Sequence, residues 1–368
     1  MVETRRATNM DETTTDMRHE HPATESKHVK GAETSGAATI RVRAGGPAQA
    51  LVNKARGFMG TSTSQQYTIL ALVHAMLAVP LIFGCNLTTK FMFGKAADPP
   101  DAQHCQLLNL YASGLLTSSS MLLALEELTR GNLLHTYTAD ILKFGLVAHS
   151  VVAFASMILF PRTLSVGWVT LEGLAALATA ALPASSLLTK PEDRSRIWRD
   201  IQNMPSWAAG ALRFRVPAQR RFSWLAIMYN LLTINFFTAG MLYFIAPKWT
   251  LYHTFGYDYG ASTHYLWKFI GSGALMTVLP AATMALKHKA DIQRMSAAPA
   301  RTLNIGLLGT SLGHLMVLGD VMAKGHGGML LPVLLGAWGG ALATSMFGLT
   351  APEMSQIAEE VVAEAKRQ

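Results

Sequence analysis

Residues 145–179, GLVAHSVVAFASMILFPRTLSVGWVTLEGLAALAT, form two long apolar runs joined by a short turn, with His149 in the first run and Glu172 in the second. A helix needs about 20 predominantly apolar residues to cross a bilayer core of about 30 Å. The stretch is therefore predicted to be a transmembrane helical hairpin that carries a histidine and an acid inside the membrane.

Part of the hairpin's sequence pattern recurs 165 positions further along the chain. His149 returns as His314, and the string Ala-Leu-Ala-Thr that ends at Thr179 returns ending at Thr344. A constant offset across two apolar segments is what a duplication leaves in a sequence. The chain is therefore predicted to contain two tandem four-helix repeats.

Composition also indicates a membrane protein. Half of the 368 residues are hydrophobic and 15% are charged, whereas soluble domains carry about 25% charged residues. Eight apolar stretches that contain almost no Lys, Arg, Asp or Glu are long enough to span a bilayer. These predicted spans are 67–84, 106–125, 141–160, 164–187, 222–246, 265–286, 302–322 and 329–349. The predicted fold class is all-α, a polytopic membrane protein with eight transmembrane helices.

The segments outside the spans are polar, and they divide the chain into five predicted parts. These are a disordered cytoplasmic tail (1–65), a first four-helix membrane unit (66–188), a basic amphipathic linker (189–221), a second four-helix membrane unit (222–350) and a short cytoplasmic tail (351–368). The linker interleaves arginines with Trp198 and Trp207. Such a stretch, from 190 to 221, is predicted to contact anionic lipid headgroups.

Basic residues predict the orientation of the spans. Lys and Arg gather in the segments that follow even-numbered spans, and basic loops face the cytoplasm. Both termini are therefore predicted to be cytoplasmic. Each half has an even number of spans, so the pseudo-twofold axis that relates the halves is predicted to lie along the membrane normal. The net charge of +8 is attributed to this topology, and nucleic acid is not predicted as a partner.

The N-terminal tail bears on location. It has no apolar run long enough for a signal peptide, and its acidic residues are atypical of an organellar transit peptide. The plasma membrane or an endomembrane is therefore favoured over an organelle.

His149 and Glu172 are the first candidates for chemistry, because ionisable groups inside a membrane are costly and often functional. Each lies about eight residues into its span, or about 12 Å at 1.5 Å per residue, so the two are predicted to meet near the midplane. The pair could relay protons or bind a ligand, but an interhelical hydrogen bond without further function is the favoured interpretation. His314 is the equivalent of His149, while Ala337 stands where the second repeat would need an acid.

Redox and enzymatic functions form a rival class. His149 and His314 could provide two axial haem ligands, although no other haem signature accompanies them. No cofactor and no metal site are predicted, because the sequence shows no metal-spaced His/Cys cluster, phosphate-binding glycine loop or catalytic triad. His74, Asn230 and Asn235 are interpreted as polar contacts between helices.

Two patterns of glycines predict close helix packing. Gly309 and Gly313, and Gly336 and Gly340, each form a G-x-x-x-G motif within an apolar span. Such faces also make a homo-oligomer or a larger membrane complex an expected partner.

The first loop on the predicted outer side contains the only two cysteines, Cys85 and Cys105. A disulfide between them is allowed if that side is oxidising. Asn86 begins an Asn-Leu-Thr sequon, which is a formal glycan site, but its place at the membrane edge argues against its use.

The second half has Phe255-Gly256 after its first helix, Ser272-Gly273 early in its second and His314 in its third. In these features each half resembles the small four-helix membrane proteins of the DoxX-like and related uncharacterised families. The resemblance implies a compact four-helix unit, here doubled, and brings no catalytic residues with it. The sequence thus favours a transporter-like or accessory membrane module without a classical catalytic site. The alternatives are an intramembrane redox protein or other enzyme, and a structural subunit of a membrane complex.

Overall fold

The computed structural model describes residues 62–97, 102–159, 163–188, 223–257, 260–292 and 294–351. The predicted linker, and nearly all of the predicted N-terminal and C-terminal tails, lie outside these ranges. All described residues belong to one compact unit, in which the two predicted four-helix segments pack together.

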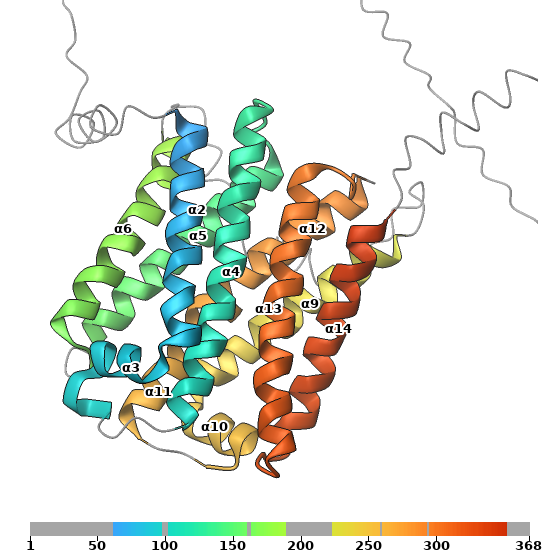
Figure 1. Ribbon diagram of the computed structural model, residues 1–368. Coiled ribbons are helices and arrows are strands. Elements are labelled where there is room, and N and C mark those ends of the chain that lie inside the picture. The colour runs from blue at the N-terminus through green and yellow to red at the C-terminus, as the bar shows by residue number, and fades with distance from the viewer. Residues whose placement is uncertain are drawn as a thin grey trace, which may run out of the picture. The chain divides into compact units, whose positions relative to one another are not determined.

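Every element of the described chain is helical (Figure 1). In chain order the elements are α2 (Thr63–Phe83), α3 (Cys85–Phe93), η1 (Gly94–Ala97), α4 (Ala102–Arg130), α5 (Tyr137–Leu159), α6 (Val166–Leu188), α9 (Trp224–Ile245), α10 (Pro247–Phe255), α11 (Ala261–Phe269), η2 (Ile270–Val278), α12 (Leu279–Asp291), α13 (Ala298–Ala323) and α14 (Leu330–Thr350). The elements α11, η2 and α12 run on without a break as one long helix, in which η2 is a π-helical segment.

Eight helices of the described chain are long and apolar enough to cross a membrane, and they coincide with the eight predicted spans. They sort into central and peripheral helices. In α4 and in the α11–η2–α12 helix, 83% of the apolar window is buried inside the protein, against 28% in α6 and in α14. The peripheral helices expose large apolar side chains such as Met76 and Phe347, which suits contact with lipid tails.

Helices of the two halves interlock at the centre of the unit. α4 packs against α2 of its own half and against α13 of the other half, while α5 packs against η2 and α12. Some polar side chains on the central helices find partners across these contacts. The Thr117 hydroxyl, for example, lies 2.5 Å from that of Thr310. An all-helical fold satisfies its backbone hydrogen bonds within each segment, as a bilayer demands.

Short helices follow the first long helix of each half. α3 and α10 lie at the end of the unit opposite the start of α2 and the end of α14 (Figure 1). Each is too short to span a membrane, which is why the sequence pattern gave only loops there. Gly84 separates α2 from α3, and the Thr88 hydroxyl donates a 2.9 Å hydrogen bond back to the Pro80 carbonyl across the junction.

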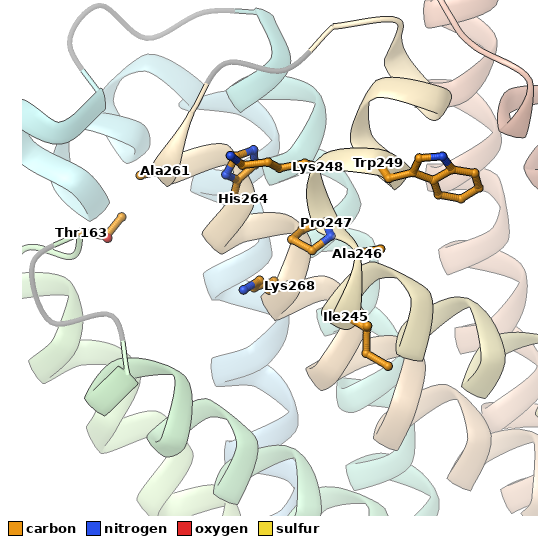
Figure 2. Close-up of a pocket in the computed structure, with 9 residues that line it drawn as sticks. All are labelled: Thr163, Ile245, Ala246, Pro247, Lys248, Trp249, Ala261, His264 and Lys268. Atoms are coloured by element: carbon orange, nitrogen blue, oxygen red, sulfur yellow. The ribbon is translucent and has the colours of Figure 1, made fainter.

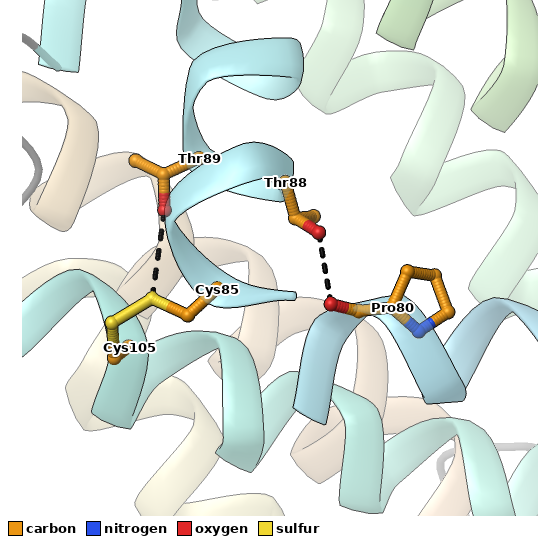
Figure 3. The surroundings of a disulfide bond; sticks show 5 residues. All are labelled: Pro80, Cys85, Thr88, Thr89 and Cys105. Carbon is orange, nitrogen blue, oxygen red and sulfur yellow. Dashed lines mark hydrogen bonds between the residues drawn. A yellow bond between two sulfur atoms is a disulfide. The ribbon is translucent and has the colours of Figure 1, made fainter. Parts of the chain in front are cut away.

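A disulfide joins Cys85 at the start of α3 to Cys105 in α4, with 5.2 Å between the two Cα atoms (Figure 3). The bond ties the short helix to a central one. Asn86 is exposed on α3, next to the disulfide.

The two predicted glycine motifs have different surroundings. A Cβ added at Gly313 would lie 2.7 Å from Ser113 Cβ, so α13 approaches α4 closely there. At Gly336 and Gly340 an added Cβ would meet nothing within 4 Å. The prediction of close packing at these two glycines is therefore wrong within this chain, because their side of α14 faces outward.

Candidate functional site

A small cavity lies inside the first half of the chain, enclosed by long helices. Its volume is about 10 Å³, about the space that one water molecule needs. The lining comes from four helices and consists of His74 and Leu77 of α2, Leu115 of α4, His149 of α5, and Glu172, Ala175, Ala176 and Thr179 of α6. Half of these side chains are polar, in a part of the protein where the surroundings are apolar.

Glu172 is 6% exposed and receives a hydrogen bond from a neighbouring central helix. The Tyr111 hydroxyl of α4 donates to Glu172 Oε1 at 3.0 Å. Tyr111 is itself held by the ring of Phe269, in an edge-on contact with 5.1 Å between centroids. The acid therefore does not project into lipid; a donor fixed by packing orients it at the cavity.

His149 lies across the cavity on α5 and is equally buried. Its ring contacts the backbone of the π-helical segment, because a Cβ added at Gly273 would lie 3.0 Å from both Cε1 and Nδ1 of the histidine. Among the described residues, Nδ1 makes no hydrogen bond of ordinary geometry, and its polar contact is with the Gly273 backbone. Buried polar atoms without partners are rare, and each needs an explanation.

His74 is a third ionisable group at the cavity. Its Nδ1 lies 2.9 Å from the Leu70 carbonyl oxygen, which only accepts, so Nδ1 carries the hydrogen. In the neutral ring Nε2 is then an acceptor. It lies 3.4 Å from the Thr179 hydroxyl, whose own hydrogen is donated to the Ala175 carbonyl at 2.7 Å. The contact of His74 Nε2 within the described chain is therefore with the Thr179 hydroxyl, another residue of the cavity lining.

The structure brings His149 and Glu172 to one cavity, as the sequence predicts, but their geometry differs from a simple pair. The hydrogen bond that Glu172 makes within the described chain comes from Tyr111. The space between acid and histidine also includes His74. Sequence reasoning missed both additional residues. An isolated histidine on α2 resembled a packing residue, and Tyr111 lies 61 positions from Glu172.

His314 lies outside the cavity, in surroundings of its own. Its Nδ1 contacts the Thr310 carbonyl at 3.0 Å and the Ser113 hydroxyl at 2.9 Å, and its ring stacks on Trp338 with centroids 3.7 Å apart. These contacts occupy the ring face and one nitrogen. With about 10 Å³ beside His149 and an indole on His314, the two sites do not fit a shared haem.

No group of three or more His, Cys, Asp or Glu side chains with the spacing for a metal ion occurs in the described part of the chain. No known family model matches the chain, and no curated protein matches it. The resemblance of each half to the DoxX-like families therefore stays a prediction, and a function can be proposed only from the arrangement of the residues.

Proposed function

We propose that this chain is a multi-pass membrane protein of the transporter-like kind, with a proton-binding site formed by His74, His149 and Glu172. The observation that carries the proposal is the convergence of three ionisable side chains, from three helices, on a cavity of about 10 Å³, about the space that one water molecule needs. Ionisable residues inside membrane helices commonly mark proton relays.

The proposed chemistry needs only these groups and a water molecule. When Glu172 gives its proton to the water, the water can pass one of its own protons to a histidine nitrogen that has a free lone pair. Glu172 becomes a carboxylate, the histidine becomes an imidazolium, and the net charge of the cavity is unchanged. The Tyr111 hydroxyl stabilises the carboxylate, because a hydrogen bond to a charged acceptor is stronger than one to a neutral acceptor.

We also propose that the two halves are tandem copies related by a pseudo-twofold axis along the membrane normal. Each half has a long helix, a nine-residue helix and then three long helices, in the same order. Both nine-residue helices end at Phe-Gly, and both glycines, Gly94 and Gly256, have positive φ. Under this correspondence the contacts across the centre fall within one residue of each other. His149 lies against Gly273 of the second half, and His314 contacts Ser113 of the first.

Under this correspondence the second half lacks the ionisable side chains that line the small cavity of the first half beside His149. The second-half counterparts of His74, Tyr111, Glu172 and Gly173 are Phe236, Ile270, Ala337 and Trp338. Trp338 packs between His314 and Phe236, with 3.7 Å and 5.1 Å between ring centroids. The indole thus fills the position where the first half has space and an acid. A purely structural role would not explain why one copy keeps three ionisable groups around a void.

The disulfide supports the proposed topology. Disulfides persist in oxidising compartments, and Cys85 and Cys105 lie at the end of the unit where α3 and α10 gather. That end follows odd-numbered spans, so it is the proposed outer side. Both chain termini are then cytoplasmic, in agreement with the distribution of Lys and Arg.

Proton movement in liposomes tests the proposed function. The purified protein would be reconstituted with a pH-sensitive dye inside the vesicles, and a potassium diffusion potential would drive protons inward. We expect acidification faster than in empty vesicles, and loss of the difference in Glu172→Gln, which keeps the side-chain shape but cannot bind the proton. The matched control is Asp320→Asn, which removes an acid at the exposed end of α13. Equal rates for wild type and empty vesicles would refute the relay.

A further inference from the structure

A second and larger cavity opens at the α3/α10 end of the unit, where α9 turns into α10 (Figure 2). Its volume is about 440 Å³, within the range of sites that bind small molecules. The lining residues are Thr163, Ile245, Ala246, Pro247, Lys248, Trp249, Ala261, His264 and Lys268. The cavity shares no residue with the proposed proton site.

Basic side chains dominate the polar part of this lining. Lys248, His264 and Lys268 belong to it, and none of the described lining residues is acidic. Two lysine ammonium groups beside one cavity give it a positive potential, which attracts an anion. The other lining residues are mainly apolar, so one ligand could contact both a charged part and an apolar part of the cavity.

Lys268 lies deeper than a surface lysine. It is seven residues beyond the start of α11 at Ala261, or about 10 Å along the helix at 1.5 Å per residue. Its side chain is half-buried, and Nζ lies 6.0 Å from the ring centroid of Phe244, near the limit of a cation–π contact. A lysine inside a membrane-spanning helix is costly and is commonly retained for a ligand or a pathway.

The surroundings place the cavity at a membrane–water boundary. Trp249 and Tyr252 on α10 are exposed, and such aromatic side chains concentrate at the headgroup level of a bilayer. Ile245, at the end of α9, lines the cavity and is 68% exposed. A ligand bound here could therefore touch both the lysines and the lipid tails along α9.

We propose that this cavity binds the phosphate group of an anionic phospholipid, with Lys248 and Lys268 contacting the phosphate and an acyl chain lying along α9 past Ile245. A free phosphate ion offers the same charged group, but it would leave the apolar part of the cavity unused. Lysine is a common phosphate ligand as a point charge.

Native mass spectrometry of the purified protein with added lipid tests this proposal. We expect phosphatidylglycerol to bind more tightly than phosphatidylcholine, and the Lys248→Gln/Lys268→Gln variant to lose about tenfold or more in affinity, since each lost charge-assisted contact weakens binding. The control is Lys90→Gln, an exposed lysine on α3 at the same end of the unit, which should bind phosphatidylglycerol as the wild type does.

Three outcomes would overturn the proposal. The first is equal binding of the two lipids, and the second is an equal loss of affinity in the control. The third is displacement by inorganic phosphate with no preference for the lipid, which would make the cavity a phosphate site. If the double variant does not fold, Ala261→Trp fills the cavity from its rim and should displace the same lipid while both lysines remain.

Discussion

The contact between Tyr111 and Glu172 allows a stability prediction with a worked magnitude. In Glu172→Ala the Tyr111 hydroxyl keeps its position between packed rings but loses its acceptor at 3.0 Å. An unsatisfied buried polar group costs about 1–3 kcal/mol. The enlarged cavity adds to this cost, because the surrounding helices relax only partly. We therefore expect a loss of about 2–4 kcal/mol in the free energy of unfolding.

Glu172→Gln should behave differently. The amide oxygen can still accept from Tyr111, so we expect a loss below about 1 kcal/mol, the usual net value of one hydrogen bond. Tyr111→Phe removes the donor, and the double variant with Glu172→Ala should be less destabilised than the sum of the two single changes. Their coupling energy should be about 1–3 kcal/mol, as for groups in contact.

Equilibrium unfolding in mixed detergent micelles, followed by tryptophan fluorescence, measures these differences. The control is Thr170→Ala, which shortens an exposed side chain on the same helix, α6. Equal stability of the Ala and Gln variants, or additive effects of Tyr111→Phe and Glu172→Ala, would refute the hydrogen bond as the feature that holds the acid at the cavity.

Three other predictions follow from the packing. Gly313→Val should lower the free energy of unfolding by about 1–3 kcal/mol through overpacking against α4. Gly336→Val lies on an open face and should change this free energy by no more than about 0.5 kcal/mol. Equal effects of the two variants in the same unfolding assay would contradict the packing described for α13 and α14. Reduction of the disulfide between Cys85 and Cys105, which closes a separation of 20 residues, should cost about 3 kcal/mol, seen as a lower thermal midpoint; an unchanged midpoint would contradict it. Trp338→Ala should lower the free energy of unfolding by about 3–5 kcal/mol but leave the proton flux per folded protein at the wild-type rate. A loss of proton flux would contradict the assignment of activity to the first half.

Much of the fold could be predicted, because a helix that crosses a bilayer needs a long apolar stretch of sequence. Long apolar stretches become helices, and each of the eight predicted spans overlaps such a helix. Several helices extend beyond the predicted ends. α4 continues to Arg130, for example, where Arg130 pairs with Glu126 one turn earlier. Charges end an apolar window but not a helix, so the hydropathy of a helix such as α4 underestimates its length.

The candidate site was less predictable, since it depends on contacts between distant parts of the chain. Depth along a helix placed His149 and Glu172 at similar levels, and both line one cavity. Depth cannot indicate which side of a helix faces a neighbour, however, so the roles of Tyr111 and His74 emerge only from packing. For the same reason Gly336 could not be distinguished from Gly313 by spacing alone.

Infrared difference spectroscopy of the purified protein tests the central claim most directly, because it detects proton binding at a single carboxyl group. The spectrum in acidic buffer minus that in alkaline buffer should contain a carbonyl stretch of a protonated acid that Glu172→Gln removes and Asp320→Asn retains. Such a band would show that Glu172 exchanges a proton with the solution from inside the membrane. A spectrum that is unchanged by Glu172→Gln would contradict the proposal that the cavity formed by His74, His149 and Glu172 binds and releases protons.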